Sequence, residues 1–188
     1  MTLEIREVET AEVGSAQPYV SDSPGELLVL GIFNDSEEIR TRFLCPPGYR
    51  IIDILNRTSD GTPGHNSFIE LVDGDTQQEV YISKEIIQFV AVDDANAGRG
   101  FGSDPRHTNY PVVEKLPVKV NVQLKSYRLI GMAYQAKNKS LKTMLGESIV
   151  FLPLTDVIIL RESKLIGEKP FVAVNKRQIL SLKKDLIS

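Results

Sequence analysis

The chain has 188 residues, 41% of them hydrophobic, and a formal net charge of −3 at pH 7. This length suits one medium domain or two small ones, and the apolar content is enough to form their cores. The most apolar stretch, residues 149–160, is shorter than the roughly 18 residues needed to span a bilayer. Because Pro153 and Asp156 also interrupt it, no membrane segment is predicted.

Charge and cysteine content limit the classes of partner and compartment. The acidic balance, with a pI of about 5.5, gives no general attraction to phosphate backbones, so nucleic acid is not favoured as a partner. The single cysteine, Cys45, cannot form an internal disulfide or, by itself, a thiolate metal site. The acidic N-terminus lacks the cationic and apolar regions of a signal peptide, so cytoplasmic residence is expected.

The first part of the chain predicts a polar tail followed by a small β domain. Residues 1–25 contain several Ser and Pro among acidic residues and no sustained period, which is typical of a tail. The segments LLVLGIF and EEIRTRFL, separated by an Asn-Asp-Ser turn, predict a hairpin. Ile51, Ile54 and Leu55 have the spacing of a short helix or turn. SFIELVD, EVYIS and EIIQFVAV predict three more strands, which complete a domain over residues 26–92.

A flexible linker and a second β domain are predicted next. Residues 93–115 are rich in Gly, Asp and Asn, as expected for a boundary between domains. The second domain covers residues 116–185 and begins with a strand in which alternate residues are apolar. The inward positions of this strand are predicted to be Val118, Val120, Val122 and Leu124.

The two domains read as diverged copies of one unit. Shifted by 90 positions, so that Leu28 falls on Val118, the first half matches the second without a gap as far as Leu55. After changes in loop length, residues 68–71 fall on residues 151–154 and residues 82–87 on residues 174–179. Matches in register along the chain favour duplication over coincidence. The predicted fold is therefore mainly β, a tandem pair of small five-stranded barrels, each with one short helix or turn.

The second half resembles a family of small prokaryotic domains. Its segments YRLIG, FLPLTDVIIL and PFVAVNKRQIL follow that family's pattern, Y-x-I-x-G, then F-L-x-L-T-D-V, then F-V-x-V-N-K-x-x-I, over residues 116–183. The first half departs from it, with Leu-Val-Asp in place of Leu-Thr-Asp and Ser-Lys in place of Asn-Lys. The family is uncharacterised, so the resemblance implies a domain boundary and no activity. By strand order alone, the layout also resembles Sm-like and SH3-like barrels.

Six residues are candidates for an interaction site. Thr155 and Asp156 could place a carboxylate at a strand end, although a short polar side chain more often accepts backbone hydrogen bonds at a turn or bulge. Two polar pairs occupy matching positions in the halves and could form a repeated binding edge: Asn175 with Lys176, and Ser83 with Lys84. The alternative is that they cap a strand bend or protect an edge from pairing.

No catalytic, cofactor or metal site is predicted. His65 and His107 are the only histidines, and both lie in turn-rich segments without a zinc-ligand spacing. Cys45 has no evident helix start or histidine beside it to lower its pKa. An enzyme is therefore the least favoured class.

Three functions remain open at this point. The first is a non-enzymatic interaction or assembly subunit that binds a protein partner or forms a homo-oligomer through strand edges. The second is an Sm-like RNA-binding module, to which basic residues in two clusters could contribute, although a solvated charged face is the favoured interpretation of these clusters. The third is a small-ligand regulatory domain, which predicts an apolar pocket between the copies. The two basic clusters are Lys137, Lys139 and Lys142, and Lys176, Arg177, Lys183 and Lys184.

Overall fold

The computed structural model describes residues 26–45, 50–56, 68–72, 76, 78–94, 114–147 and 149–185. The predicted tail, most of the predicted linker and both histidines lie outside the described residues. The fold is mainly β, as predicted. In the part of the chain that is described, neither α-helix approaches the length and apolar character needed to cross a membrane.

In the first half, five strands and one short helix form close to the segments predicted for them. The first half contains β1 (Glu26–Phe33), β2 (Glu38–Cys45), α1 (Ile51–Leu55), β3 (Phe68–Val72), β4 (Glu79–Ser83) and β5 (Phe89–Val92). The second contains β6 (Lys115–Gln123), β7 (Arg128–Ala136), α2 (Leu141–Gly146), β8 (Phe151–Arg161), β9 (Lys164–Asn175), the 3₁₀ helix η3 (Lys176–Gln178) and β10 (Ser181–Lys184). β5 is shorter than the predicted strand because residues 84–86 form a turn.

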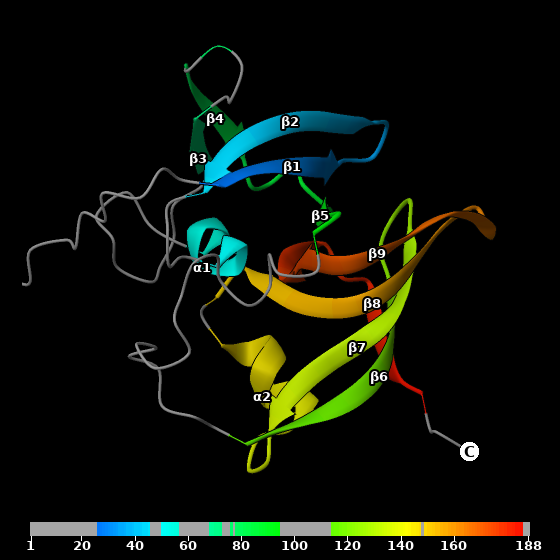
Figure 1. Cartoon of the computed structure of the whole chain (residues 1–188). Coiled ribbons are helices and arrows are strands. Elements are labelled where there is room, and N and C mark those ends of the chain that lie inside the picture. Colours follow the sequence, from blue (N-terminus) through cyan, green and yellow to red (C-terminus); the bar gives the residue numbers. More distant parts are fainter. Residues whose placement is uncertain are drawn as a thin grey trace, which may run out of the picture.

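Eight strands form one continuous antiparallel sheet in the order β10-β6-β7-β8-β9-β5-β1-β2 (Figure 1). β3 and β4 form a separate hairpin, and β3 contacts β2. Both sheets are open among the described residues, so the structure differs from the predicted pair of separate closed barrels. The reason is that β5, the last strand of the first half, pairs with β9 of the second and joins the two halves edge to edge.

Pairing registers correspond between the two halves. The shift of 90 positions carries the β1–β2 pair Phe33–Glu38 onto the β6–β7 pair Gln123–Arg128. The last strands correspond too, since Phe33 pairs with Phe89 and Gln123 pairs with Ser181. In the third and fourth strands, the pair Phe68–Ser83 corresponds to Phe151–Asn175. β4 and β9 are therefore equivalent fourth strands, and β5 and β10 are equivalent fifth strands.

The core lies on both faces of the joined sheet. Successive side chains of a strand point to opposite faces, and β5 contributes Val90 and Val92 to one apolar cluster and Phe89 and Ala91 to the other. The first cluster includes α1 and Ile69, and the second includes the inner residues of β6 to β9. All four positions predicted to point inward are buried, which confirms that pattern: Val118, Val120 and Val122 on β6, and Leu124 directly after it.

Candidate functional site at the junction between the halves

The junction begins with the β5–β9 ladder. Four residue pairs form it, from Phe89–Val174 to Val92–Phe171. All the β5 residues are buried, and the paired residues of β9 are buried as well. An edge contact of this kind satisfies backbone donors and acceptors that would otherwise remain free at the ends of two sheets.

Asn175 fastens the end of this ladder. It is completely buried, and its Nδ2 donates to the carbonyl oxygens of Lys84 at 2.7 Å and Ile87 at 2.9 Å. Its Oδ1 accepts from the backbone N–H of Arg177 at 3.0 Å, which caps η3. Its backbone N–H donates to the carbonyl of Gln88. All these hydrogen bonds of the side chain of Asn175, a predicted interaction residue, are therefore to other residues of this chain, and two of them connect the two halves.

Lys176 and Lys84 occupy equivalent positions one residue after the fourth strands. The Nζ of Lys176 donates to the carbonyl oxygens of Met144 at 3.0 Å and Glu147 at 2.7 Å, which caps the C-terminal end of α2. Burial lowers the pKa of Lys176, and the charge of Glu147 opposes that shift. Lys84 is only 2% exposed, and burial lowers its pKa, with a further contribution from the Arg177 guanidinium.

Asn56 is a second connection that the sequence did not suggest. It follows α1, and its Oδ1 accepts from the backbone N–H groups of Val150 at 2.9 Å and Phe151 at 2.8 Å. It links the helix of the first half to the start of β8 in the second. The sequence signal was weak, because an asparagine after a short helix is as typical of a helix end as of a distant contact.

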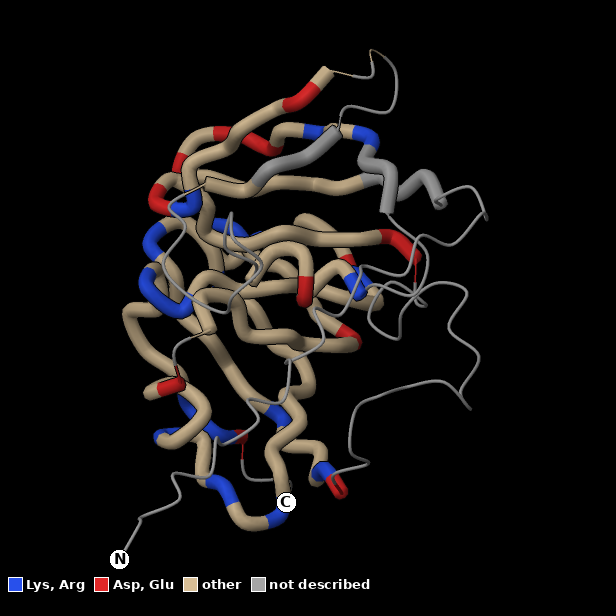
Figure 2. Tube along the Cα trace, turned by 90° about the vertical axis from the view of Figure 1, so that its left-hand side faces the viewer, with Lys and Arg blue, Asp and Glu red and all other residues tan. Residues whose placement is uncertain are grey.

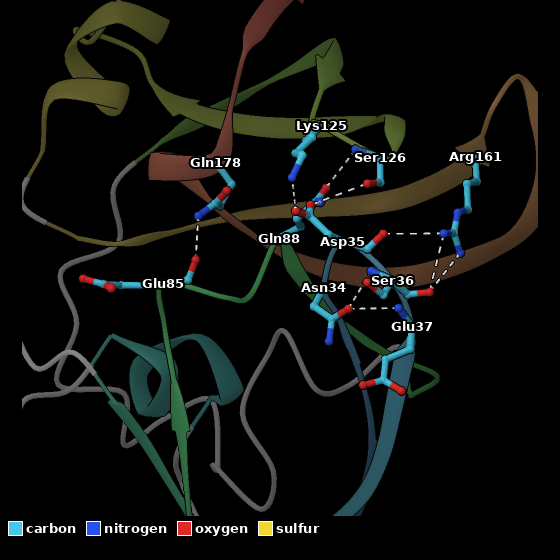
Figure 3. A network of polar contacts seen from close by, with 10 residues as sticks. All are labelled: Asn34, Asp35, Ser36, Glu37, Glu85, Gln88, Lys125, Ser126, Arg161 and Gln178. Atoms are coloured by element: carbon cyan, nitrogen blue, oxygen red, sulfur yellow. Dashed lines mark hydrogen bonds and ion pairs between the residues drawn. The ribbon is translucent and has the colours of Figure 1, made fainter.

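A polar network at the hairpin turns lies beside the same end of the junction, because it includes Gln88, whose carbonyl accepts from the backbone N–H of Asn175 (Figure 3). The carboxylate of Asp35 accepts hydrogen bonds from Gln88 Nε2 and Lys125 Nζ. Arg161 donates to the carbonyl oxygens of Asp35 and Ser36 at 3.4–3.5 Å. The turns of β1–β2, β6–β7 and β8–β9 are thereby held together.

Asp35 gives the protein a pH-dependent stability that can be measured. The hydrogen bond from Lys125 lowers the pKa of the Asp35 carboxyl from its ordinary 3.8, against the opposing effect of burial. Its contribution is therefore present above about pH 4 and is lost as the pH falls through the lowered pKa. We expect Asp35→Asn to cost at most about 1 kcal/mol at pH 6, as for exposed ion pairs. In urea unfolding, this difference from the wild type should shrink as the pH falls below the ordinary carboxyl pKa of 3.8 toward the lowered pKa.

The partner residue supplies the control for this prediction. Lys125→Ala removes the same ion pair, so the Asp35→Asn substitution added to it should cost less than in the wild type. Equal costs in both backgrounds would show that Lys125 is not the source of the effect.

Thr155 and Asp156 lie at a β-bulge of β8, one strand away from the β5–β9 ladder, since Thr155 pairs with Phe171 of β9. Asp156 has a φ of 52°, and the β7–β8 register shifts between Ile130 and Met132, opposite this point. Thr155 Oγ1 donates to Asp156 Oδ2 at 3.2 Å. The bulge interpretation of this pair thus has a direct geometric basis. Ser83, the sixth candidate, is half-buried at the end of β4, where its Oγ accepts from the backbone N–H of Glu85.

Gly131 faces this bulge and allows the two strands to approach. A Cβ built there would lie 2.8 Å from Val157 Cγ2 and 3.0 Å from the Thr155 carbonyl oxygen. We expect Gly131→Ala to lower the free energy of unfolding by about 1–3 kcal/mol, because the crowding atoms are buried or in the backbone. Gly167→Ala is the control, since nothing lies within 4 Å of its Cβ position. Equal urea midpoints for the two variants would contradict the close approach.

A polar pocket of about 360 Å³ opens beside the Asp35 network. The hairpin turns that line it contribute Lys125, Arg128 and Arg161, together with Glu162. Arg161 also lies 5.5 Å above the ring of Tyr127. Such a surface suits an anionic group better than an apolar ligand. In the described part of the chain, no three His, Cys, Asp or Glu side chains come together in a way that could hold a metal ion.

Comparison of the chain with known protein families, with curated proteins and with solved structures gave no match. The class of protein is therefore defined by its own geometry: a mainly β protein with two corresponding halves, joined through the fifth strand of one and the fourth strand of the other.

Proposed function

We propose that this protein is a non-enzymatic assembly subunit built from two diverged copies of a small five-stranded β unit, which associates with other protein chains through strand edges. The supporting observation is the β5–β9 ladder with Asn175 at its end, because this chain already uses edge pairing to join one unit to another. Each half is a potential member of a longer array, and addition of strands is a general mode of protein recognition.

The experiment is a measurement of mass in solution by light scattering, combined with the ratio of absorbance at 260 and 280 nm. A mass above that of one 21.0 kDa chain, free of nucleic acid, is the expected result. A monomer that retains RNA through purification would contradict the proposal.

A second candidate function, RNA binding by an Sm-like module, has a specific observation in its favour. Residues 116–185 contain 13 Lys and Arg against five Asp and Glu, a net charge of +8, whereas residues 26–92 contain five against 11, a net charge of −6. The pocket with Lys125, Arg128 and Arg161 lies on the basic half. Binding that falls steeply as salt rises, and that is lost in Arg128→Ala, would support this alternative.

A further inference from the structure

The two sheets of the described fold have four edge strands: β10, β2, β3 and β4. β2 and β3 contact each other, which leaves β10 and β4 as the two outer edges. β10 ends the eight-stranded sheet beyond β6, and β4 ends the hairpin beyond β3. By register, β10 is the equivalent of β5, and β4 is the equivalent of β9. The free edges are therefore the same two kinds of edge, fifth and fourth strand, that join each other inside the chain.

We infer that the occupant of these edges is a second copy of this chain, whose β4 pairs with β10 in a head-to-tail array. The inference rests on the proposed assembly function and specifies its partner. Since the two surfaces differ, the contact is heterologous and repeats from copy to copy, giving a ring or a filament.

The internal ladder fixes the register of this contact. Its pairs run from Phe89–Val174 to Val92–Phe171. The equivalent residues of the free edges would then pair, between one copy and the next, as Ser181–Ile82, Leu182–Tyr81, Lys183–Val80 and Lys184–Glu79. The last pair places opposite charges directly across from each other, which stabilises antiparallel strands.

Charge at the hairpin turns points to the same arrangement. Asp35 and Lys125 occupy equivalent positions in the two halves, and they form an ion pair across the internal junction. The same geometry between copies brings Lys125 of one copy to Asp35 of the next.

In Figure 2, most of the acidic segments lie in the upper part of the molecule, formed by the first half, and basic segments predominate in the lower part. Net charges of −6 and +8 favour the contact of unlike halves over that of like halves.

Exposed apolar side chains accompany both edges. Tyr81 on β4 is 58% exposed and Ile86, in the turn after it, is 53% exposed. On the other edge, Leu180 just before β10 is 69% exposed. Its equivalent, Gln88, is buried by the internal junction. Contact between copies would cover these residues in the same way.

The first test is a charge exchange at the Lys184–Glu79 pair. Glu79→Lys and Lys184→Glu should each weaken self-association about tenfold, as measured by the concentration dependence of light scattering, because like charges then face each other. The double variant should recover most of this loss. Lys142→Glu on the exposed surface of α2 is the control, with the same change in charge and no position at either edge.

The second test is a disulfide that only the proposed register allows. In a Cys45→Ser background, Glu79→Cys combined with Lys184→Cys should give a ladder of oligomers on a non-reducing gel, because facing Cα atoms lie about 4.5–5.5 Å apart. Glu79→Cys with Lys183→Cys should not, since neighbouring side chains point to opposite faces. Neither single variant should form dimers in a head-to-tail contact.

Three results would overturn the inference. Each of them also shows whether the proposed assembly function fails together with the inference or remains valid without it. If the protein is a multimer whose association is unchanged by the charge exchange and whose cysteine variant gives no series of oligomers on the gel, the assembly function stands but these two edges do not form the contact. A monomer at all concentrations that is free of RNA would exclude a second copy as the partner and leave assembly with a different protein. A monomer that carries RNA would contradict both proposals.

Discussion

Replacing Asn175 by alanine should lower the free energy of unfolding by about 3 kcal/mol or more. The substitution leaves the buried carbonyl oxygens of Lys84 and Ile87 without this donor and the N–H of Arg177 without this acceptor. Each buried polar group left unsatisfied costs about 1–3 kcal/mol. Asn175→Asp should be at least as damaging near neutral pH, because a carboxylate has no hydrogen to donate and would face two carbonyl oxygens. Urea unfolding followed by circular dichroism measures both.

A matched asparagine in the same half provides the control. Asn121 on β6 is half-buried and accepts one hydrogen bond, from Arg128 at 2.9 Å. Asn121→Ala should cost less than about 1 kcal/mol, since water can replace that bond. If the two alanine variants were equally stable, the hydrogen bonds of Asn175 would not stabilise the junction between the halves.

The sequence predicts the parts of this fold that depend on local patterns. Alternation of apolar residues places β6, with its inward Val118 to Leu124 positions, and the spacing of Ile51, Ile54 and Leu55 places α1. The correspondence between the strand registers of the two halves can also be followed from the sequence, because apolar residues recur at fixed shifts. The proposal of two copies of one ancestral unit depends on that correspondence.

Pairing between distant edges is harder to predict. The β5–β9 ladder is made by backbone groups that every residue carries, and a continuous apolar run such as FVAV fits a closed unit as well as a shared sheet. For this reason the sequence suggested two separate barrels, whereas the structure has one sheet running through both halves. Asn175 and Lys176 stand out in the sequence as polar residues at a strand end that matches Ser83 and Lys84. Nothing local in the sequence indicates that their partners lie inside the chain.

The Asp35 network shows the same limit. Its residues come from three hairpin turns and, for Gln88, from the bend before β5, and each of these segments has the composition of an ordinary solvated turn. Only the pairing of the strands brings Asp35 near Lys125 and Gln88. Polar groups that converge through tertiary structure leave no periodic signal in a sequence.

Replacing Phe89 by alanine should destabilise both halves together. Phe89 is completely buried in β5 of the first half. It stacks on Phe33 with ring centroids 4.3 Å apart, and it meets Tyr127 of the second half edge-on at 5.1 Å. Truncation of a buried phenylalanine costs about 3–5 kcal/mol, which is a large part of the stability of a typical domain. Phe68→Ala, at a position that is 47% exposed, should cost much less.

Hydrogen exchange can then decide whether the two halves form one cooperative unit. Because Phe89 contributes to a core that includes β6, β7 and β8, its loss should reduce the protection of amides in β6–β7 and in β1–β2 by the same free energy. Reduced protection in β1–β2 alone would contradict this, since it would mean that the second half remains folded without the junction. Equal reduction in both halves would mean that the packing of Phe89 across the junction couples the two halves into one cooperative unit.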